Sequence, residues 1–114
     1  NAHGTSTGLG DKAESKAVEK MIGSKYENAN LYVSSTKSMH GHMLGATGAV
    51  ESIVCVKTIN ENIVPPTINL DNQDEEVANL NYVPNKAQKA EIHAALSNSF
   101  GFGGHNATLV FKEV

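Results

Sequence analysis

The chain has 114 residues, of which 39% are hydrophobic, and a formal net charge of −3 at pH 7. This length supports one domain with a hydrophobic core, while the negative charge and the lack of a basic run argue against nucleic-acid binding. No apolar run approaches the ~18 residues that a membrane-spanning helix requires. The single cysteine, Cys55, excludes an internal disulfide and favours a reducing cytoplasm. Because the chain begins at Asn1 and not at a methionine, we expect a fragment of a longer protein.

Helices and short strands alternate along the chain. Asp11 with Glu14 three residues later has the pattern of a capping box, which predicts a helix over residues 11–22 that Gly23 terminates. The other expected elements are a short buried strand over 31–33, a largely buried helix over about 43–60, an exposed loop over 67–81, and strands over 92–97 and 108–112. This order predicts an α/β fold with helices layered on a mixed sheet.

Three polar stretches contain most of the residues that could carry chemistry: 1–7, 34–49 and 97–106. Nine of the ten glycines and four of the five histidines lie in these stretches or directly beside them. Loops held between rigid elements are common places for functional side chains, because the elements on both sides fix their positions. We therefore expect the functional site in these stretches and scaffold between them.

Glu51 stands inside the apolar helix and therefore needs a partner, for which Lys37, His42 or a bound cation are the candidates. Cys55 lies in the middle of the same helix. This position is typical of a core thiol and argues against a role as a nucleophile.

The clustered histidines have two chemical interpretations. Zinc sites use three or four ligands, so a metal site is one interpretation, although no cysteine or carboxylate completes a recognisable ligand pattern. In the other, two neutral histidines in one pocket donate hydrogen bonds to an oxygen that becomes negative during reaction, and backbone N–H groups of a glycine-rich loop serve a second oxygen. This second interpretation indicates acyl chemistry. The four histidines concerned are His3, His40, His42 and His105.

Three motifs carry a resemblance to a known family: residues 1–7 (NAHGTST), 34–42 (SSTKSMHGH) and 98–106 (NSFGFGGHN). Together they resemble the C-terminal part of the 3-oxoacyl-[acyl-carrier-protein] synthases, in order and spacing, over essentially the whole chain. Residues 36–39 (TKSM) and 45–51 (GATGAVE) are most similar to the elongating enzymes of bacterial type II fatty acid synthesis.

The resemblance implies a thiolase-like fold built of two related α/β halves, of which residues 1–114 form most of the second as one domain truncated at its N-terminus. It also implies a condensing enzyme. An acyl chain passes from acyl carrier protein to a cysteine, malonyl-carrier thioester is decarboxylated, and the resulting enolate attacks the acyl-cysteine. The implied partners are acyl carrier protein and a second copy of the full-length enzyme.

The resemblance also implies roles for individual residues. His3 and His42 would be the catalytic histidines that bind the malonyl thioester oxygen, and Lys37 would support them through an ion pair to Glu51. Phe102 would be the gating residue of the glycine-rich loop, with its backbone N–H in an oxyanion hole. The resemblance further implies substrate binding by Thr5 and Thr7 and a structural monovalent cation near Asn1, Glu51, Ser97 and Asn98. Structural support by Asp11 and Glu14 follows instead from their capping-box spacing.

Two departures from the family qualify these expectations. Gly8 stands where relatives mostly have proline, and the nucleophilic cysteine of the family belongs to the N-terminal half, which this sequence does not include. We therefore expect the isolated chain to be inactive in condensation. The alternatives are a non-condensing remnant that binds carrier protein or acts as a decarboxylase, and a histidine metal-binding module.

Overall fold

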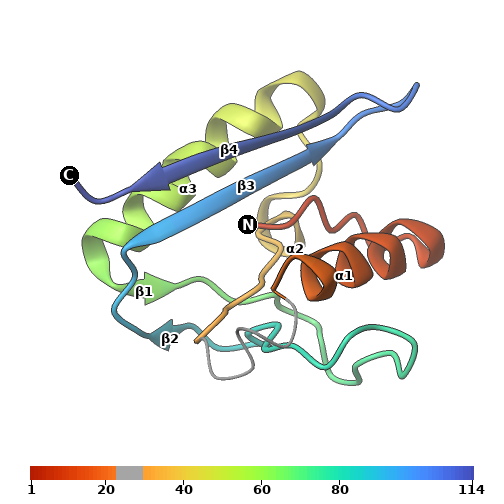
Figure 1. The fold of residues 1–114 in the computed structure, drawn as a ribbon, viewed down its shortest axis with the longest axis horizontal. Coiled ribbons are helices and arrows are strands. Elements are labelled where there is room, and N and C mark those ends of the chain that lie inside the picture. The colour runs from red at the N-terminus through yellow and green to blue at the C-terminus, as the bar shows by residue number, and fades with distance from the viewer. Residues whose placement is uncertain (23–29) are drawn as a thin grey trace.

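A long helix packed on a two-stranded ribbon forms the C-terminal body of the chain, and a second helix lies on the opposite side of the N-terminal loop (Figure 1). The structure, a computed structural model, describes residues 1–22 and 30–114. The expected C-cap at Gly23 and most of the connection after it lie outside the described residues. The elements are α1 (Gly8–Ile22), α2 (Lys37–His40), the 3-10 turn η2 (Leu44–Ala46), α3 (Thr47–Glu61), β1 (Ile63–Val64), β2 (Gln88–Lys89), β3 (Ala94–Phe100) and β4 (Asn106–Lys112).

Helix α3 lies along the antiparallel ribbon of β3 and β4, whose register runs from Ala94 opposite Lys112 to Phe100 opposite Asn106 (Figure 1). Side chains four residues apart share one face of a helix, and this is the spacing of the buried positions of α3. These positions are Thr47, Glu51, Cys55 and Ile59. The face of α3 that covers the rest of the chain thus includes a threonine and a carboxylate next to the polar stretches.

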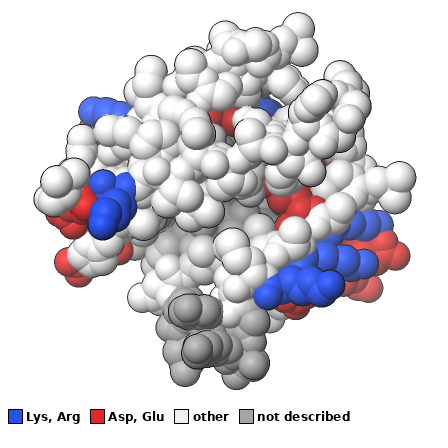
Figure 2. All heavy atoms as spheres, turned by 45° about the horizontal axis from the view of Figure 1, so that its top comes forward, with Lys and Arg blue, Asp and Glu red and all other residues white. Residues whose placement is uncertain are grey.

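The helix expected over about 43–60 was predicted to be largely buried, and in the described chain one side of it is exposed. Ile53 is 62% exposed on α3, and Leu109 and Val110 are exposed on β4. In the view that brings α3 and β4 forward, uncharged side chains fill most of the surface and charged side chains lie mainly at its borders (Figure 2). This helix has more apolar surface than the described residues cover.

The two predicted helices begin at other residues than expected. Helix α1 begins at Gly8, so Asp11 lies in its first turn, where its backbone N–H donates to the Thr7 carbonyl. The predicted capping box is therefore wrong, because the helix continues back through Leu9 and Gly10. Helix α3 begins at Thr47 and not at Met43, since Leu44 adopts a left-handed conformation with φ of 51°.

The predicted strands are confirmed in part. The C-terminal pair forms as an antiparallel ribbon, but β3 continues to Phe100, into the stretch expected to be loop. The buried strand predicted over 31–33 is reduced to a single parallel bridge between Tyr32 and Asn81, and the short pair β1–β2 was not predicted. Among the described residues, no helix has the length and apolarity needed to cross a membrane.

The loop over 67–81 is largely exposed, as predicted, but a polar contact anchors its end to α1. Ser15 Oγ accepts a hydrogen bond from the Ala78 N–H at 2.7 Å and contacts Tyr82 Oη at 2.6 Å. The Tyr82 hydroxyl donates to the Ala78 carbonyl at 3.1 Å. This contact holds the loop beside α1, at the border of the cavity described below.

Candidate functional site

His42 is presented by a sharp turn between α2 and η2. Gly41 has φ of 72°, a left-handed conformation that glycine adopts without steric cost. The Nδ1 atom of His42 accepts a hydrogen bond from the Leu44 N–H at 3.0 Å and lies 3.2 Å from Thr47 Oγ1. A neutral imidazole whose Nδ1 is an acceptor carries its proton on Nε2. His42 therefore has an Nε2–H group available as a donor.

The loop that carries His3 is fastened alongside the residues that precede α2. The Ala2 N–H donates to the Ser34 carbonyl at 2.8 Å, and Ser35 Oγ donates to the Gly4 carbonyl at 2.7 Å. A Cβ atom at Gly4, where φ is 40°, would lie 2.6 Å from Ser35 Cβ. Glycine is thus required at this position for the two loops to approach each other.

The buried carboxylate of Glu14 fixes the backbone on both sides of His3. It accepts hydrogen bonds from the N–H groups of His3 and Gly4, each at 2.9 Å, and from Asn98 Nδ2 at 3.1 Å. Glu14 therefore supports the site structurally, by binding three donors and not by capping α1. Asp11 lies farther along the same loop and helix, where burial raises the pKa of its carboxyl group.

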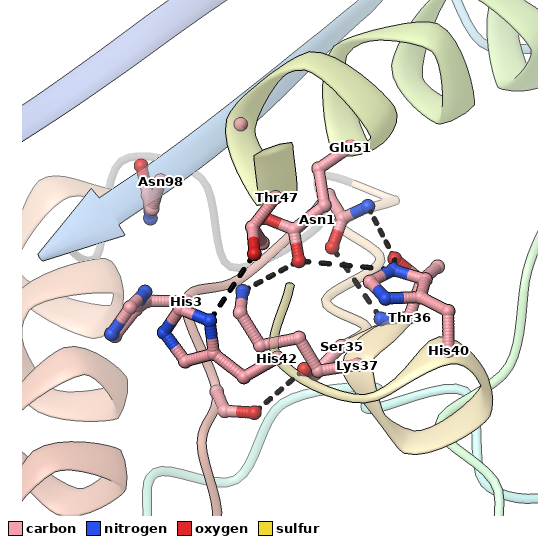
Figure 3. A network of polar contacts seen from close by, with 12 residues as sticks. Asn1, His3, Ser35, Thr36, Lys37, His40, His42, Thr47, Glu51 and Asn98 are labelled. Atoms are coloured by element: carbon pink, nitrogen blue, oxygen red, sulfur yellow. Dashed lines mark hydrogen bonds and ion pairs between the residues drawn. The ribbon is translucent and has the colours of Figure 1, made fainter. Parts of the chain in front are cut away.

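His3 and His42 meet as the sequence predicts, with ring centroids 5.7 Å apart in an edge-to-face arrangement (Figure 3). The ring of Phe100 lies on His3 at a centroid distance of 5.6 Å. Burial lowers the pKa of His3, and the positive charge of Lys37 lowers it further. The Nδ1 atom of His3 is buried and has no hydrogen-bond partner among the described residues. His3 is therefore neutral near pH 7.

Lys37 and Glu51 form the predicted ion pair, with Lys37 Nζ 2.5 Å from Glu51 Oε1 (Figure 3). The two side chains are only 4% and 0% exposed. Each charge therefore depends on the other, because a buried charge without a partner is strongly destabilising. Lys37 is thus the partner that Glu51 needs, and the ion pair keeps the positive charge of Lys37 next to the two histidines.

Both ring nitrogens of His40, which lies beside this ion pair, have polar contacts. Its Nε2 atom lies 3.0 Å from Thr36 Oγ1, and its Nδ1 atom lies 2.7 Å from the Gly41 carbonyl oxygen. Thr36 Oγ1 in turn accepts a hydrogen bond from Asn1 Nδ2 at 2.9 Å. These contacts connect the first residue of the His3 loop to the turn that presents His42.

Thr5 and Thr7 lie at a cavity of about 700 Å³, which His42 and Lys37 also line. The hydroxyl oxygens of the two threonines are 3.3 Å apart, and polar groups of this kind in a cavity suit a polar substrate arm. Phe102, by contrast, is fully exposed at the tip of the β3–β4 hairpin. Within this chain it does not lie with the histidines.

The four residues expected around a cation do not all converge. Glu51 Oε2 is buried and has no partner among the described residues, and Ser97 is buried. Asn98, however, uses its side chain elsewhere: its amide donates to Glu14 at 3.1 Å and its oxygen accepts from Thr108 at 2.9 Å. The backbone N–H of Asn98 donates to the Asn1 carbonyl at 3.0 Å, whereas the Asn98 side chain lies apart from Glu51 (Figure 3).

The described residues contain no group of three or more His, Cys, Asp or Glu side chains that could hold a metal ion. The histidine metal site is thus not assembled there: His3 and His42 meet, while the carbonyl of His105 accepts the Gly101 N–H at 2.7 Å in the hairpin loop. Cys55 is buried, and burial raises the pKa of its thiol. This agrees with the predicted core thiol and leaves no nucleophile at the site within the described residues.

Sequence reasoning missed three residues that contact the histidines: Thr36, Thr47 and Phe100. Thr47 had no signal of its own, since the expected helix began at about residue 43 and Thr47 begins the helix only in the structure. Phe100 was assigned to a loop, and only its place on β3 aims its ring at His3.

The comparisons with known proteins agree with this geometry. Residues 1–71 match the family model described as "Beta-ketoacyl synthase, C-terminal domain". The chain is 53% identical over its full length to 3-oxoacyl-[acyl-carrier-protein] synthase 2 of Coxiella burnetii, of which it covers 27%. It is 51% identical over 99% of its length to the synthase of the same name from Synechocystis, of which it covers 26%.

Solved structures agree in fold. A beta-ketoacyl synthase from Burkholderia phymatum has a TM-score of 0.90 and 40% identity, and the comparison covers 100% of this chain and 27% of that one. A ketosynthase of a type II polyketide synthase, solved in complex with its acyl-carrier protein, has a TM-score of 0.91 and 36% identity with the same coverage. The predicted α/β, thiolase-like fold is confirmed. The chain spans about a quarter of the length of the relatives it matches, and it belongs to the beta-ketoacyl synthase family as part of the C-terminal domain.

Proposed function

We propose that the protein containing this chain is a 3-oxoacyl-[acyl-carrier-protein] synthase that elongates acyl chains by decarboxylative condensation. The observation that carries this proposal is the meeting of His3 and His42 at 5.7 Å, with His42 Nδ1 occupied by the Leu44 N–H. Two neutral imidazoles in this arrangement are suited to bind one oxygen atom that gains negative charge.

In the proposed reaction, the malonyl thioester oxygen accepts hydrogen bonds from His3 and His42. The bond between the malonyl carboxylate and its neighbouring carbon breaks, CO₂ leaves, and the electron pair moves into an enolate whose oxygen stays bound to the histidines. The enolate carbon then attacks the carbonyl of an acyl-cysteine, a carbon–carbon bond forms, and the cysteine thiolate leaves. Neutral histidines suit this step because each is a donor and neither needs to lose a proton.

The other site residues support these steps. Lys37, paired with Glu51, maintains a positive charge beside the enolate oxygen and is not the nucleophile. Thr5 and Thr7 would bind the pantetheine arm in the cavity. Phe102 would gate the acyl site once the remainder of the protein covers the hairpin, since it is fully exposed in this chain.

The nucleophilic cysteine would come from the remainder of the protein, because Cys55 is buried and its pKa is raised. A thiol that resists ionisation is a poor nucleophile. The partners would be acyl carrier protein, which the related polyketide ketosynthase binds, and a second copy of the full-length enzyme. We place this enzyme in the cytoplasm.

A monovalent cation near Glu51 is part of this proposal. Carboxylate, amide and hydroxyl oxygens of Glu51, Asn1 and Ser97 are ligands that hard cations prefer, and the buried Glu51 Oε2 has no partner among the described residues. The cation would compensate this oxygen and stabilise the fold. We expect the complete protein to unfold at a higher temperature in KCl or NaCl than in choline chloride of equal ionic strength, and Glu51→Gln to reduce this difference.

The mass of the acyl adduct tests the proposed function. The complete protein is incubated with acyl-carrier protein and digested, and the modified peptide is identified. We expect an adduct on a cysteine outside residues 1–114. The variants His3→Ala and His42→Ala should still form this adduct but should lose malonyl decarboxylation. An adduct on Cys55 would refute the assignment of the nucleophile, and decarboxylation without any condensed product would favour the non-condensing alternative.

A further inference from the structure

We infer that His40 is a positioning residue, which holds the turn that presents His42 and ties this turn to Asn1 at the start of the His3 loop. The inference rests on the proposed function, because it concerns the step in which His42 binds the malonyl thioester. His40 itself does not face the cavity that His42 and Lys37 line.

Both ring nitrogens of His40 have defined partners. A carbonyl oxygen only accepts, so the Nδ1 atom, 2.7 Å from the Gly41 oxygen, carries the proton. In the neutral ring Nε2 is then an acceptor, and Thr36 Oγ1, at 3.0 Å, donates to it. The Thr36 oxygen accepts in turn from Asn1 Nδ2 at 2.9 Å. The donors thus run in one direction, from Asn1 through Thr36 to His40 and on to Gly41.

The end of this chain of hydrogen bonds is the peptide group that joins Gly41 to His42. Gly41 has φ of 72°, and glycine has more accessible conformations than any other residue, so its own stereochemistry does not restrain this peptide. The bond from His40 Nδ1–H to the Gly41 oxygen supplies a restraint. A misplacement of about 1 Å in a catalytic group can slow a reaction about 100-fold.

His40 does not act by replacing Lys37 in the ion pair. Its Nε2 atom is 4.0 Å from Glu51 Oε1, beyond hydrogen-bond distance, while Lys37 Nζ is at 2.5 Å from the same oxygen. Loss of the His40 ring therefore leaves the buried charges paired. It removes the restraint on Gly41 and the acceptor for the Thr36 hydroxyl.

Three substitutions in the complete protein distinguish the contributions of the two ring nitrogens of His40. His40→Leu removes both, His40→Asn retains a donor near the position of Nδ1, and His40→Gln retains a polar group near the position of Nε2. Two rates are measured for each variant: decarboxylation of malonyl-carrier protein, and acyl transfer to the nucleophilic cysteine. His93→Leu is the matched control, since His93 is exposed and its charged contacts among the described residues are Glu91 and Glu113.

We expect His40→Leu to lower kcat for decarboxylation about tenfold or more, with KM and the rate of acyl transfer nearly unchanged. His40→Asn should recover activity to within about threefold of the parent, and His40→Gln should not. Thr36→Val should give a smaller loss, and adding it to His40→Leu should cost little more, because the two residues act in one chain of hydrogen bonds.

The opposite results would overturn the inference. Equal losses in decarboxylation and acyl transfer would mean a general structural role, and recovery by His40→Gln but not by His40→Asn would mean that the bond to Gly41 is unimportant. If His40→Leu fails to fold, the comparison of the Asn and Gln variants still decides. A parent enzyme without decarboxylation would refute the proposed function instead, so the two failures are distinguishable.

Discussion

The middle of strand β3 and the hairpin tip that follows the strand differ in what they face. Beside Ser97 and Asn98, the strand meets the His3 loop and the buried carboxylate of Glu14, where polar groups have specified partners. Beyond Phe100, the hairpin tip extends into solvent and Phe102 is fully exposed. The histidine side of the site is thus organised by contacts within this chain. The hairpin tip, which the proposed function assigns to the acyl side, is left uncovered by the described residues.

The exposed apolar side chains of β4 and of the outer face of α3 also lie away from the histidines. They remain uncovered, while the face of α3 toward the histidines buries Thr47 and Glu51. Changes near the histidines should therefore affect stability and decarboxylation together. Changes at the hairpin tip should affect acyl transfer without affecting the stability of this region.

The largest effect on stability is expected from Lys37→Ala, which leaves the fully buried Glu51 carboxylate without the positively charged lysine as its partner. Breaking a buried ion pair on one side costs about 3–5 kcal/mol. Denaturant unfolding of the complete protein measures this cost. Removal of both charges in Lys37→Met/Glu51→Leu should cost less than Lys37→Ala alone, and Lys16→Ala on the exposed face of α1 is the control.

Lys37→Ala also tests the role of the lysine. In the proposed mechanism Lys37 supports the histidines and does not react covalently, so acyl transfer should survive in part in any fraction that remains folded. Complete loss of the acyl adduct, with the fold intact by circular dichroism, would contradict this role.

Glu14→Ala should have the next largest effect. It removes the acceptor of the His3 and Gly4 N–H groups and of the Asn98 amide. Buried donors without acceptors cost about 1–3 kcal/mol each, so we expect a loss of about 3 kcal/mol in unfolding free energy, with decarboxylation reduced as His3 moves. Glu19→Ala, an exposed glutamate on the same helix, should stay within about 0.5 kcal/mol of the parent.

A smaller effect is expected from pH. The pKa of folded His3 is lowered from its ordinary value of 6.5 by burial, so the folded state binds the proton less readily than the unfolded state. This contribution to stability is fully present above pH 6.5 and is lost as pH falls through the lowered pKa. Urea unfolding across this range measures it, and His3→Asn should flatten the slope.

His93 has to be removed from the background of this experiment, because its pKa is raised, chiefly by its hydrogen bond to Glu113. Its stabilising contribution has the opposite dependence: it is present below pH 6.5 and is lost as pH rises through the raised pKa. The measurement is therefore made in His93→Gln. An unchanged slope after His3→Asn in that background would contradict the neutral state assigned to His3.

The smallest effect on stability is expected from Phe102→Ala, within about 0.5 kcal/mol, because the ring is fully exposed in this chain. Acyl transfer should nevertheless slow about tenfold in the complete protein, since the gating role proposed for Phe102 would have its side chain position the acyl group. Rapid-quench measurement of the acyl adduct checks this rate. A loss of stability equal to that of Glu14→Ala would show that Phe102 is a core residue in the complete protein.

The amino-acid sequence by itself determined much of the histidine site. The motifs of residues 1–7 and 34–42, through the family they resemble, predicted that His3 and His42 belong together. An acidic residue in an apolar helix predicted a partner for Glu51, and the resemblance pointed to Lys37 among the three candidates. These predictions succeeded because a buried charge requires a partner and few candidates were available. The roles assigned to Thr5, Thr7 and Phe102 stay predictions.

Only the tertiary structure decided how these residues are held. Spacing placed Asp11 and Glu14 in a capping box, whereas in the fold Glu14 binds the backbone of the His3 loop from helix α1. Local pattern also failed to show that His40 and Thr36 connect the two histidine loops. The physical reason is that a carboxylate or an imidazole binds whichever donors and acceptors long-range packing brings near, and these partners leave no periodic signal in the sequence.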